Sequence, residues 1–360
     1  MLYIARTAEH SLPGDRTRTA AAALVGLAIL LAVAALVSLL TGASDASISR
    51  LMGSWFGVGL DDPLLARDRL VFLDIRFPRV MLGALIGAGL SVSGVIMQGL
   101  FRNPLADPGL VGVSSGSALG AAGVIVLGTT VFAPVVAALG IYSLQVCAFG
   151  GGLLTTFILY RVSNRNGQTE VATMLLAGIA LAALAGAVTG LLVYIATDSE
   201  LRDLTFWQLG SLAGANWQKV LASAPIIGGT LALSFFLGRQ LNALTLGEAT
   251  AAHLGIEVER LKRLAMVSVA AATGASVAVS GGIGFVGIVV PHLLRLVIGP
   301  DHRFLLPAAA LLGAAFLLLV DALARVIVAP AELPIGIVTA AIGGPFFLWI
   351  LLRRRGQLGW

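Results

Sequence analysis

The chain has 360 residues, of which 58% are hydrophobic and only 11% are charged, whereas soluble domains carry roughly 25% charged residues. This composition excludes an ordinary soluble domain and indicates a protein that crosses a membrane many times. The formal net charge of +5 is attributed to lysines and arginines in loops that face the cytoplasm, so no nucleic-acid partner is expected. The single cysteine, Cys147, excludes an intrachain disulfide and a multi-cysteine metal site.

A helix that crosses a hydrocarbon core about 30 Å thick needs roughly 20 apolar residues. Measured in this way, the sequence predicts one all-helical membrane domain over residues 1–360, with about ten spans in the lipid bilayer. We expect the spans near residues 20–40, 80–100, 111–129, 136–160, 171–197, 220–238, 264–280, 283–298, 304–320 and 335–352. The first apolar run exceeds the about 7–15 residues of a secretory signal peptide, so we interpret it as a retained helix.

The distribution of positive charge predicts the orientation of these spans. Most lysines and arginines between the spans fall on the side of the two termini, which an even number of spans places together. Because cytoplasmic loops carry the excess of these residues, both termini are expected in the cytoplasm. The two longest external segments would then be 42–79 and 197–219, and the second is too short and too polar to span.

The most distinctive stretch runs from Gln98 to Ala122 and interrupts an otherwise apolar sequence. Its Asn-Pro and Asp-Pro pairs favour a turn, because the residue before a proline avoids the helical conformation. After the turn, Gly112, Gly116 and Gly120 recur at four-residue spacing. This spacing places small residues on one face of a helix and lets a second helix approach closely inside a bilayer.

The same stretch contains FRNPLADPGLVGVSSG at 101–116, which is similar to a motif of one membrane-protein family. The chain resembles the FecCD-type permeases, the membrane subunits of bacterial ABC importers for iron–siderophore complexes, heme and vitamin B12. Further matching motifs are DIRFPRVMLGALIGAGL at 74–90, GFVGIVVPHLLRL at 284–296 and AELPIGIVTAAIGGPFF at 331–347. The resemblance implies a vitamin B12 permease-like, type II importer fold in the bacterial inner membrane.

The resemblance also implies the partners: a second copy of the chain, two copies of an ABC ATPase subunit, and a periplasmic substrate-binding protein. The sequence is most similar to hemin permeases, so heme is the expected cargo, with a ferric siderophore or cobalamin as alternatives. The subunit itself is expected not to be an enzyme, since Lys219 and Lys262 do not follow a glycine and no phosphate-binding loop is present. The four histidines show no ligand spacing, so no cofactor and no metal site are expected.

The cytoplasmic segment 239–263 is the expected contact with the ATPase. In its GEATAAHLG sequence an acidic residue follows Gly247, and a basic cluster comes later, as a short helix favours. From the residues alone, an ordinary amphipathic linker is the alternative. In related permeases two short helices at this position sit in a cleft of the ATPase, and this resemblance places five residues at the contact: Glu248, Ala252, His253, Leu254 and Gly255.

Three arginines near the outer ends of two spans are the expected contact with the binding protein. Arg76 and Arg79 precede or begin the second span, and Arg325 follows Asp321 by four residues. The residues alone leave open two alternatives, which are lipid headgroup binding by the first pair and an i,i+4 ion pair between Asp321 and Arg325. The resemblance implies that arginines at these positions receive glutamates from the two lobes of the binding protein.

The fifth span is rich in alanine and glycine, which either pack against another helix or leave room for a bulky cargo. The resemblance makes this helix pore-lining, with Gly186 and Gly190 in the pore and Val171 and Ala172 at the cytoplasmic gate, where relatives have small hydroxyl residues. A secondary transporter is the alternative from a different class. It would need ionisable groups or broken helices inside the membrane to couple ions, and central carboxylates are scarce in this sequence.

Overall fold

The computed structural model describes five stretches of the chain: residues 16–42, 44–58, 60–165, 168–329 and 331–354. Within them the regular secondary structure is helical apart from one hairpin of two short antiparallel strands, β1 (Asn164–Arg165) and β2 (Gln168–Thr169). This confirms the all-helical fold class. The helices are α1 (Thr17–Leu40), α2 (Ile48–Trp55), α3 (Leu65–Arg69), η1 (Leu70–Arg76), α4 (Phe77–Leu100), η2 (Pro108–Val111), α5 (Val113–Leu127), α6 (Ala133–Leu139), η3 (Gly140–Tyr142), α7 (Ser143–Ser163), α8 (Val171–Ile195), α9 (Asp198–Gln208), α10 (Trp217–Thr245), α11 (Glu248–His253), α12 (Val258–Ser280), α13 (Val286–Ile298), α14 (His302–Ile327) and α15 (Ile335–Arg354).

Apolar helices of membrane-spanning length make up most of this fold. Among the described residues, seven helical stretches of at least 18 residues are long and apolar enough to cross a membrane. These are Thr17–Leu40, Leu65–Leu100, Ala133–Ser163, Val171–Ile195, Trp217–Thr245, Val258–Ser280 and His302–Ile327, and three shorter apolar helices join them: Val113–Leu127, Val286–Ile298 and Ile335–Ile350. Together they agree with the number of spans that the sequence predicts.

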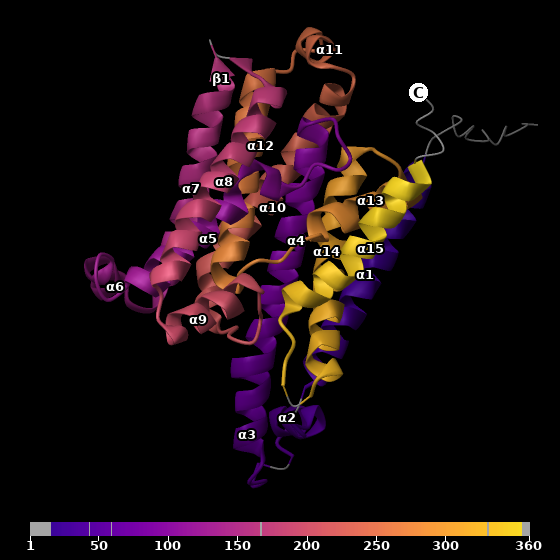
Figure 1. Cartoon of the computed structure of the whole chain (residues 1–360). Helices are drawn as coiled ribbons and strands as arrows, with labels where there is room; N and C mark the ends of the chain where they lie inside the picture. The colour runs from indigo at the N-terminus through magenta and orange to yellow at the C-terminus, as the bar shows by residue number, and fades with distance from the viewer. Residues whose placement is uncertain (1–15, 43, 59, 166–167, 330, 355–360) are drawn as a thin grey trace, which may run out of the picture.

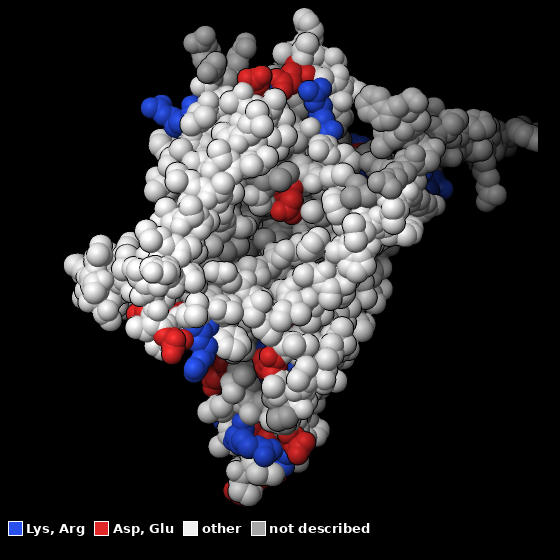
Figure 2. Space-filling view, viewed as in Figure 1, with Lys and Arg blue, Asp and Glu red and all other residues white. Residues whose placement is uncertain are grey.

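Many of the short elements that connect the long helices lie at two opposite faces of the bundle (Figure 1). The helix α11, the strand β1 and the C-terminal end of α15 are at one face, whereas α2, α3, α6 and α9 are at the other. Charged side chains gather at these two ends, and most of the broad belt between them shows none (Figure 2). In the predicted orientation, the face with α11 is cytoplasmic and the opposite face is the outer one.

The long helices α4 and α12 are the most deeply buried. α4 contacts α10, α12, α13 and α14, so it lies inside the bundle. Glycines allow two of these close approaches: a Cβ at Gly87 would lie 2.2 Å from the carbonyl oxygen of Gly313 in α14, and a Cβ at Gly94 would lie 2.0 Å from that of Gly287 in α13. Any side chain there would overlap the neighbouring backbone, so small residues set these helix distances.

The glycine-rich face after the Asn-Pro turn packs against α7. A Cβ at Gly116 would lie 2.5 Å from the carbonyl oxygen of Gly151, and a Cβ at Gly120 would lie 2.1 Å from that of Cys147. Gly112, the first of the series, precedes α5 and has a φ of 73°, a left-handed conformation that glycine adopts readily. The prediction of close packing by this face is confirmed, and Gly112 also makes the turn.

The two external segments are more helical than the sequence predicts. α2 and α3 form in the first, and α3 continues through η1 into α4, so that one stretch covers Leu65–Leu100. At about 1.5 Å per residue, this stretch is long enough to extend beyond a bilayer core of about 30 Å. The second segment contains α9, whose first turn is fixed by a capping box between Thr197 and Glu200.

Candidate functional site

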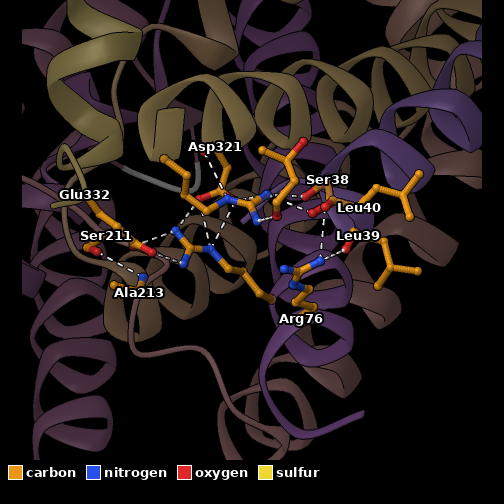
Figure 3. A network of polar contacts seen from close by, with 11 residues as sticks. Ser38, Leu39, Leu40, Arg76, Ser211, Ala213, Asp321 and Glu332 are labelled. Atoms are coloured by element: carbon orange, nitrogen blue, oxygen red, sulfur yellow. Dashed lines mark hydrogen bonds and ion pairs between the residues drawn. The ribbon is translucent and has the colours of Figure 1, made fainter. Parts of the chain in front are cut away.

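A network of buried arginines joins α1, α4 and α14 at the outer face (Figure 3). Arg79, in the first turn of α4, lies between two carboxylates. Its Nε and Nη2 donate to Asp321 of α14 at 2.8–3.2 Å, and its Nη1 and Nη2 donate to Glu332 at 2.9–3.0 Å. Forked contacts of this kind favour arginine over lysine. Asp321 is only 1% exposed, whereas the side chain of Glu332 is 37% exposed, so a molecule outside could reach Glu332 first.

The other two arginines hold the C-terminal end of α1. Arg76 donates through Nη1 to the carbonyl oxygens of Leu39 and Leu40, at 2.9 and 3.1 Å. Arg325 donates through Nη2 to the carbonyl oxygen of Ser38 at 3.0 Å. The last carbonyls of a helix lack partners inside the helix and lie at the negative end of its dipole. Two guanidinium groups, one from the end of η1 and one from α14, therefore cap α1 and fix it against these helices.

The sequence predicted part of this network. The i,i+4 ion pair of Asp321 with Arg325 is present, with 3.2 Å between Nη2 and Oδ2, so the alternative that spacing alone suggested is confirmed. The contact of Arg76, Arg79 and Arg325 with a binding protein stays a prediction, because in the single chain these residues are only 5–8% exposed. Sequence reasoning missed the α1 carbonyls and Glu332. The acidic residue in the AELPIG motif was the available signal for Glu332.

The short helix α11 presents an exposed surface at the cytoplasmic face. Four residues of the predicted ATPase contact are exposed there: Ala252, His253, Leu254 and Gly255. Two leucines flank the helix, Leu246 and Leu254, and they are 66% and 61% exposed. Glu248 differs from the rest, because its carboxylate turns back and accepts a hydrogen bond from Lys262. These two leucines leave apolar surface at both ends of α11 that a second protein could cover.

A cavity of about 600 Å³ lies between α11 and the start of α8. Val171 and Ala172, the predicted gate residues, line it from α8, and Glu248 and Ala252 line it from α11. The first turn of α8 follows directly after β2, so the hairpin and the gate residues are one continuous segment. The structure therefore brings the predicted gate and the predicted ATPase contact to the same space, which their separation in the sequence does not indicate.

The glycines of α8 differ from those of α5. A Cβ at Gly186 or Gly190 would meet no atom within 4 Å, and both residues are exposed. No part of the described chain packs on the helix there, so packing within the chain does not require these small residues. That face of α8 is free for a second protein or for a passing molecule. The pore role of both glycines stays a prediction.

The described histidines do not converge on one point. His253 is exposed at the C-terminal end of α11, and His292 packs edge-on against Phe346, with 5.9 Å between the ring centroids. His302 is 2% exposed, and its Nδ1 lies 2.8 Å from the amide oxygen of Asn242, which can only accept, so Nδ1 carries the proton. Over the part of the chain that the structure describes, no cluster of His, Cys, Asp or Glu is able to hold a metal ion.

Known proteins match this chain over most of its length. The FecCD transport family matches residues 30–353. The hemin transport system permease protein HmuU of Yersinia pestis is 50% identical over 287 residues, which are 80% of this chain and 84% of that protein. The cobalamin import system permease protein BtuC of Halobacterium salinarum is 46% identical over 280 residues, which are 78% of this chain and 73% of that protein.

A solved structure agrees with these sequence matches. It is described as an inward-facing conformation of a metal-chelate type ABC transporter, and it has a TM-score of 0.79 and 35% sequence identity. The similarity covers 92% of this chain and 98% of that one. The family match includes the outer arginine network, α8 and α11. The chain belongs to the FecCD transport family and is a multi-pass membrane permease subunit of an ABC importer of the metal-chelate, hemin and vitamin B12 type.

Proposed function

We propose that this chain forms the pathway by which heme, or a related iron chelate, crosses the bacterial inner membrane. The observation that carries the proposal is the higher sequence identity with a hemin permease than with a cobalamin permease. Cobalamin and a ferric siderophore are the alternative cargoes within the same family. The scattered histidines suit transport of heme without tight ligation, because a pathway has to release its cargo.

Two copies of the chain enclose the pathway in this proposal. The exposed face of α8 supports it, since Gly186 and Gly190 have open space around them. Small residues let a bulky planar cargo pass, and they also allow a helix of the second copy to approach. Val171 and Ala172 then form the cytoplasmic gate at the first turn of the same helix.

Energy enters the transporter through α11. An ABC ATPase subunit packs on the exposed residues Ala252 to Gly255, and each copy of the permease binds one ATPase. The two exposed leucines that flank α11 support this assignment, as does the cavity that α11 shares with the gate residues. Burial of such apolar side chains favours association, at roughly 25 cal/mol per Å² of apolar surface removed from water.

A substrate-binding protein docks at the outer arginine network. Arg79 is the residue best placed to bind a carboxylate of the binding protein, because one of the two acids that it contacts within the chain, Glu332, is partly exposed. A glutamate of the binding protein would replace Glu332 while Asp321 keeps its contact with Arg79. The capping of α1 by Arg76 and Arg325 gives the docking surface a fixed shape.

The cargo is tested by reconstitution with a cognate ATPase and binding protein in liposomes. We expect ATP-dependent uptake of hemin to exceed uptake of cobalamin and of a ferric siderophore at equal concentration. A matched control uses an ATPase with a disabled Walker B carboxylate, which abolishes hydrolysis but keeps the complex. Faster uptake of cobalamin or of a ferric siderophore than of hemin would contradict the assignment of heme.

A further inference from the structure

Lys262 is a buried lysine with three partners from three segments of the chain. It lies in the second turn of α12 and is 2% exposed. Its Nζ donates to the carbonyl oxygen of Thr169 at 2.9 Å, to Glu248 at 2.8 Å and to Glu259 at 3.1 Å. A lysine ammonium has three donors, so these contacts use its full hydrogen-bonding capacity. Lys262 therefore fixes its three partners in one arrangement.

Two of these partners belong to segments that are proposed to move during transport, namely the start of α8 and α11. Thr169 ends the strand β2 and stands two residues before Val171, the first residue of α8. Glu248 is the first residue of α11. Lys262 thus bridges the segment that carries the gate and the segment that contacts the ATPase, and its side chain lines the cavity between them.

Glu259 strengthens the link on the side of the gate. Its Oε1 accepts from the backbone N–H of Thr169 at 3.2 Å, and its Oε2 accepts from the Thr169 hydroxyl at 2.7 Å. The backbone N–H, carbonyl and hydroxyl of Thr169 are therefore all held by two residues of one helix turn in α12. Among the described residues, α11 is bound to Lys262 through Glu248 alone. A movement of α11 would therefore act on Lys262 through this contact.

We propose that Lys262 is a positioning residue that connects α11 to the start of α8, so that displacement of α11 by the ATPase moves the cytoplasmic gate. This inference rests on the proposed function of α11. A charged group buried at this place is costly unless it is paired. The side chains of Glu248 and Glu259 are 40% and 35% exposed, so water can solvate both carboxylates. The stability of these two acids alone therefore does not require a buried ammonium group beside them.

The substitution Lys262→Met tests this link, because methionine fills a similar volume without the ammonium. The wild-type and variant subunits are assembled with ATPase and binding protein in liposomes, and ATP hydrolysis and hemin uptake are measured in the same sample. We expect hydrolysis to persist while uptake per ATP falls about tenfold, a usual size for coupling between two sites. The matched control is Arg260→Gln on the same helix, where an exposed ion pair with Glu257 spans 3.7 Å; uptake per ATP should stay within about twofold.

A second variant separates a broken link from a damaged fold. Glu248→Gln weakens the same contact from a half-exposed side chain and should also lower uptake per ATP in complexes that keep their ATPase. The double variant should be no worse than Lys262→Met alone, since the Lys262–Glu248 contact that Glu248→Gln weakens is already absent in Lys262→Met. The proposal would be overturned by additive losses in the double variant, or by unchanged uptake per ATP in Lys262→Met. If Lys262→Met does not fold, unchanged uptake per ATP in Glu248→Gln would overturn it. A wild-type complex without ATP-driven uptake would instead count against the proposed function.

Discussion

The two faces of this permease differ in how exposed their proposed partner contacts are. At the outer face, Arg76, Arg79 and Arg325 are buried, and their donors are directed to α1, Asp321 and Glu332. At the cytoplasmic face, Ala252 to Gly255 are exposed, whereas Glu248 turns inward to the buried Lys262. The outer arginines hold helices of the same chain together, whereas α11 keeps its surface free for another protein.

This difference shows that a residue's match to a family motif does not tell whether its side chain is buried inside the chain or exposed to a partner. An arginine that caps the end of α1 stabilises the fold in every state in which α1 stays in place. Reversing its charge would set a carboxylate against carbonyl oxygens. A loss of binding-protein affinity in Arg76→Glu or Arg325→Glu could therefore arise from a distorted outer face or from a lost docking contact. A sharper test has to leave the hydrogen bonds from Arg76 and Arg325 to α1 intact.

The largest expected effect is on the stability of the outer face. Arg79→Ala removes the forked partner of the buried Asp321 and leaves Arg325 as its ionic partner, so the cost should lie at the lower end of the about 3–5 kcal/mol for breaking a buried pair. We expect a clear drop in the unfolding temperature of the detergent-solubilised subunit. The control is Arg67→Ala, whose side chain is 47% exposed beside Asp68 and whose loss should cost less than about 1 kcal/mol. Equal stability of Arg79→Ala and wild type would show that the network is not structural.

The next effect is on association at the cytoplasmic face. Leu254→Arg places a charge where we expect an apolar contact, so affinity for the ATPase should fall by at least about tenfold, or roughly 1.4 kcal/mol. The unfolding temperature should not change, because Leu254 is 61% exposed in the single chain. Leu254→Met, which keeps an apolar side chain, should retain the ATPase. Co-purification of a full complement of ATPase with Leu254→Arg would rule out this contact.

A smaller effect concerns Glu332 as the exchangeable partner of Arg79. Glu332→Gln removes the charge that a carboxylate of the binding protein has to displace. Affinity for the binding protein should therefore rise by roughly threefold to tenfold, which corresponds to about 0.7–1.4 kcal/mol. A binding titration at constant ionic strength measures it, since exposed charges are screened by salt. Weaker binding in Glu332→Gln would mean that Glu332 supports docking and is not displaced by it.

The smallest effect is expected on heme ligation, to which the histidines should contribute nothing. His253→Ala, His292→Ala and His302→Ala should leave the absorption spectrum of hemin-loaded transporter unchanged, because none of the three is an axial ligand in our account. His302→Ala should still lose about 1 kcal/mol of stability, since it removes a buried hydrogen bond to Asn242. A stoichiometric heme spectrum that disappears in one of these variants would show a ligand that the geometry does not reveal.

Much of the fold was predictable because it follows from local patterns. Apolar runs of sufficient length predict membrane-spanning helices, and seven long and three short apolar helices are present among the described residues. Glycines at four-residue spacing predict a close helix contact, which Gly116 and Gly120 make with α7. The spacing of Asp321 and Arg325 predicts their ion pair. Each of these signals lies within one helix or one turn.

The remaining features depend on contacts between segments far apart in the chain. Arg79 meets Glu332 across 253 positions, and Lys262 meets Thr169 across 93 positions. No periodicity or spacing encodes such pairs, because they arise only when helices pack. The capping of α1 is hidden for a further reason, since the acceptors are backbone carbonyls and carry no sequence signal. The family resemblance singled out Arg76, Arg79 and Arg325, but it did not indicate their internal partners.

The central claim is that this subunit moves its cargo only when an ATPase acts on it. It is tested most directly in liposomes that contain the subunit alone or the subunit with its ATPase, with binding protein and hemin outside. We predict accumulation of hemin against its gradient only when the ATPase and ATP are both present, with or without an imposed proton gradient. Accumulation by the subunit alone, driven by the proton gradient, would contradict the account and identify a secondary transporter.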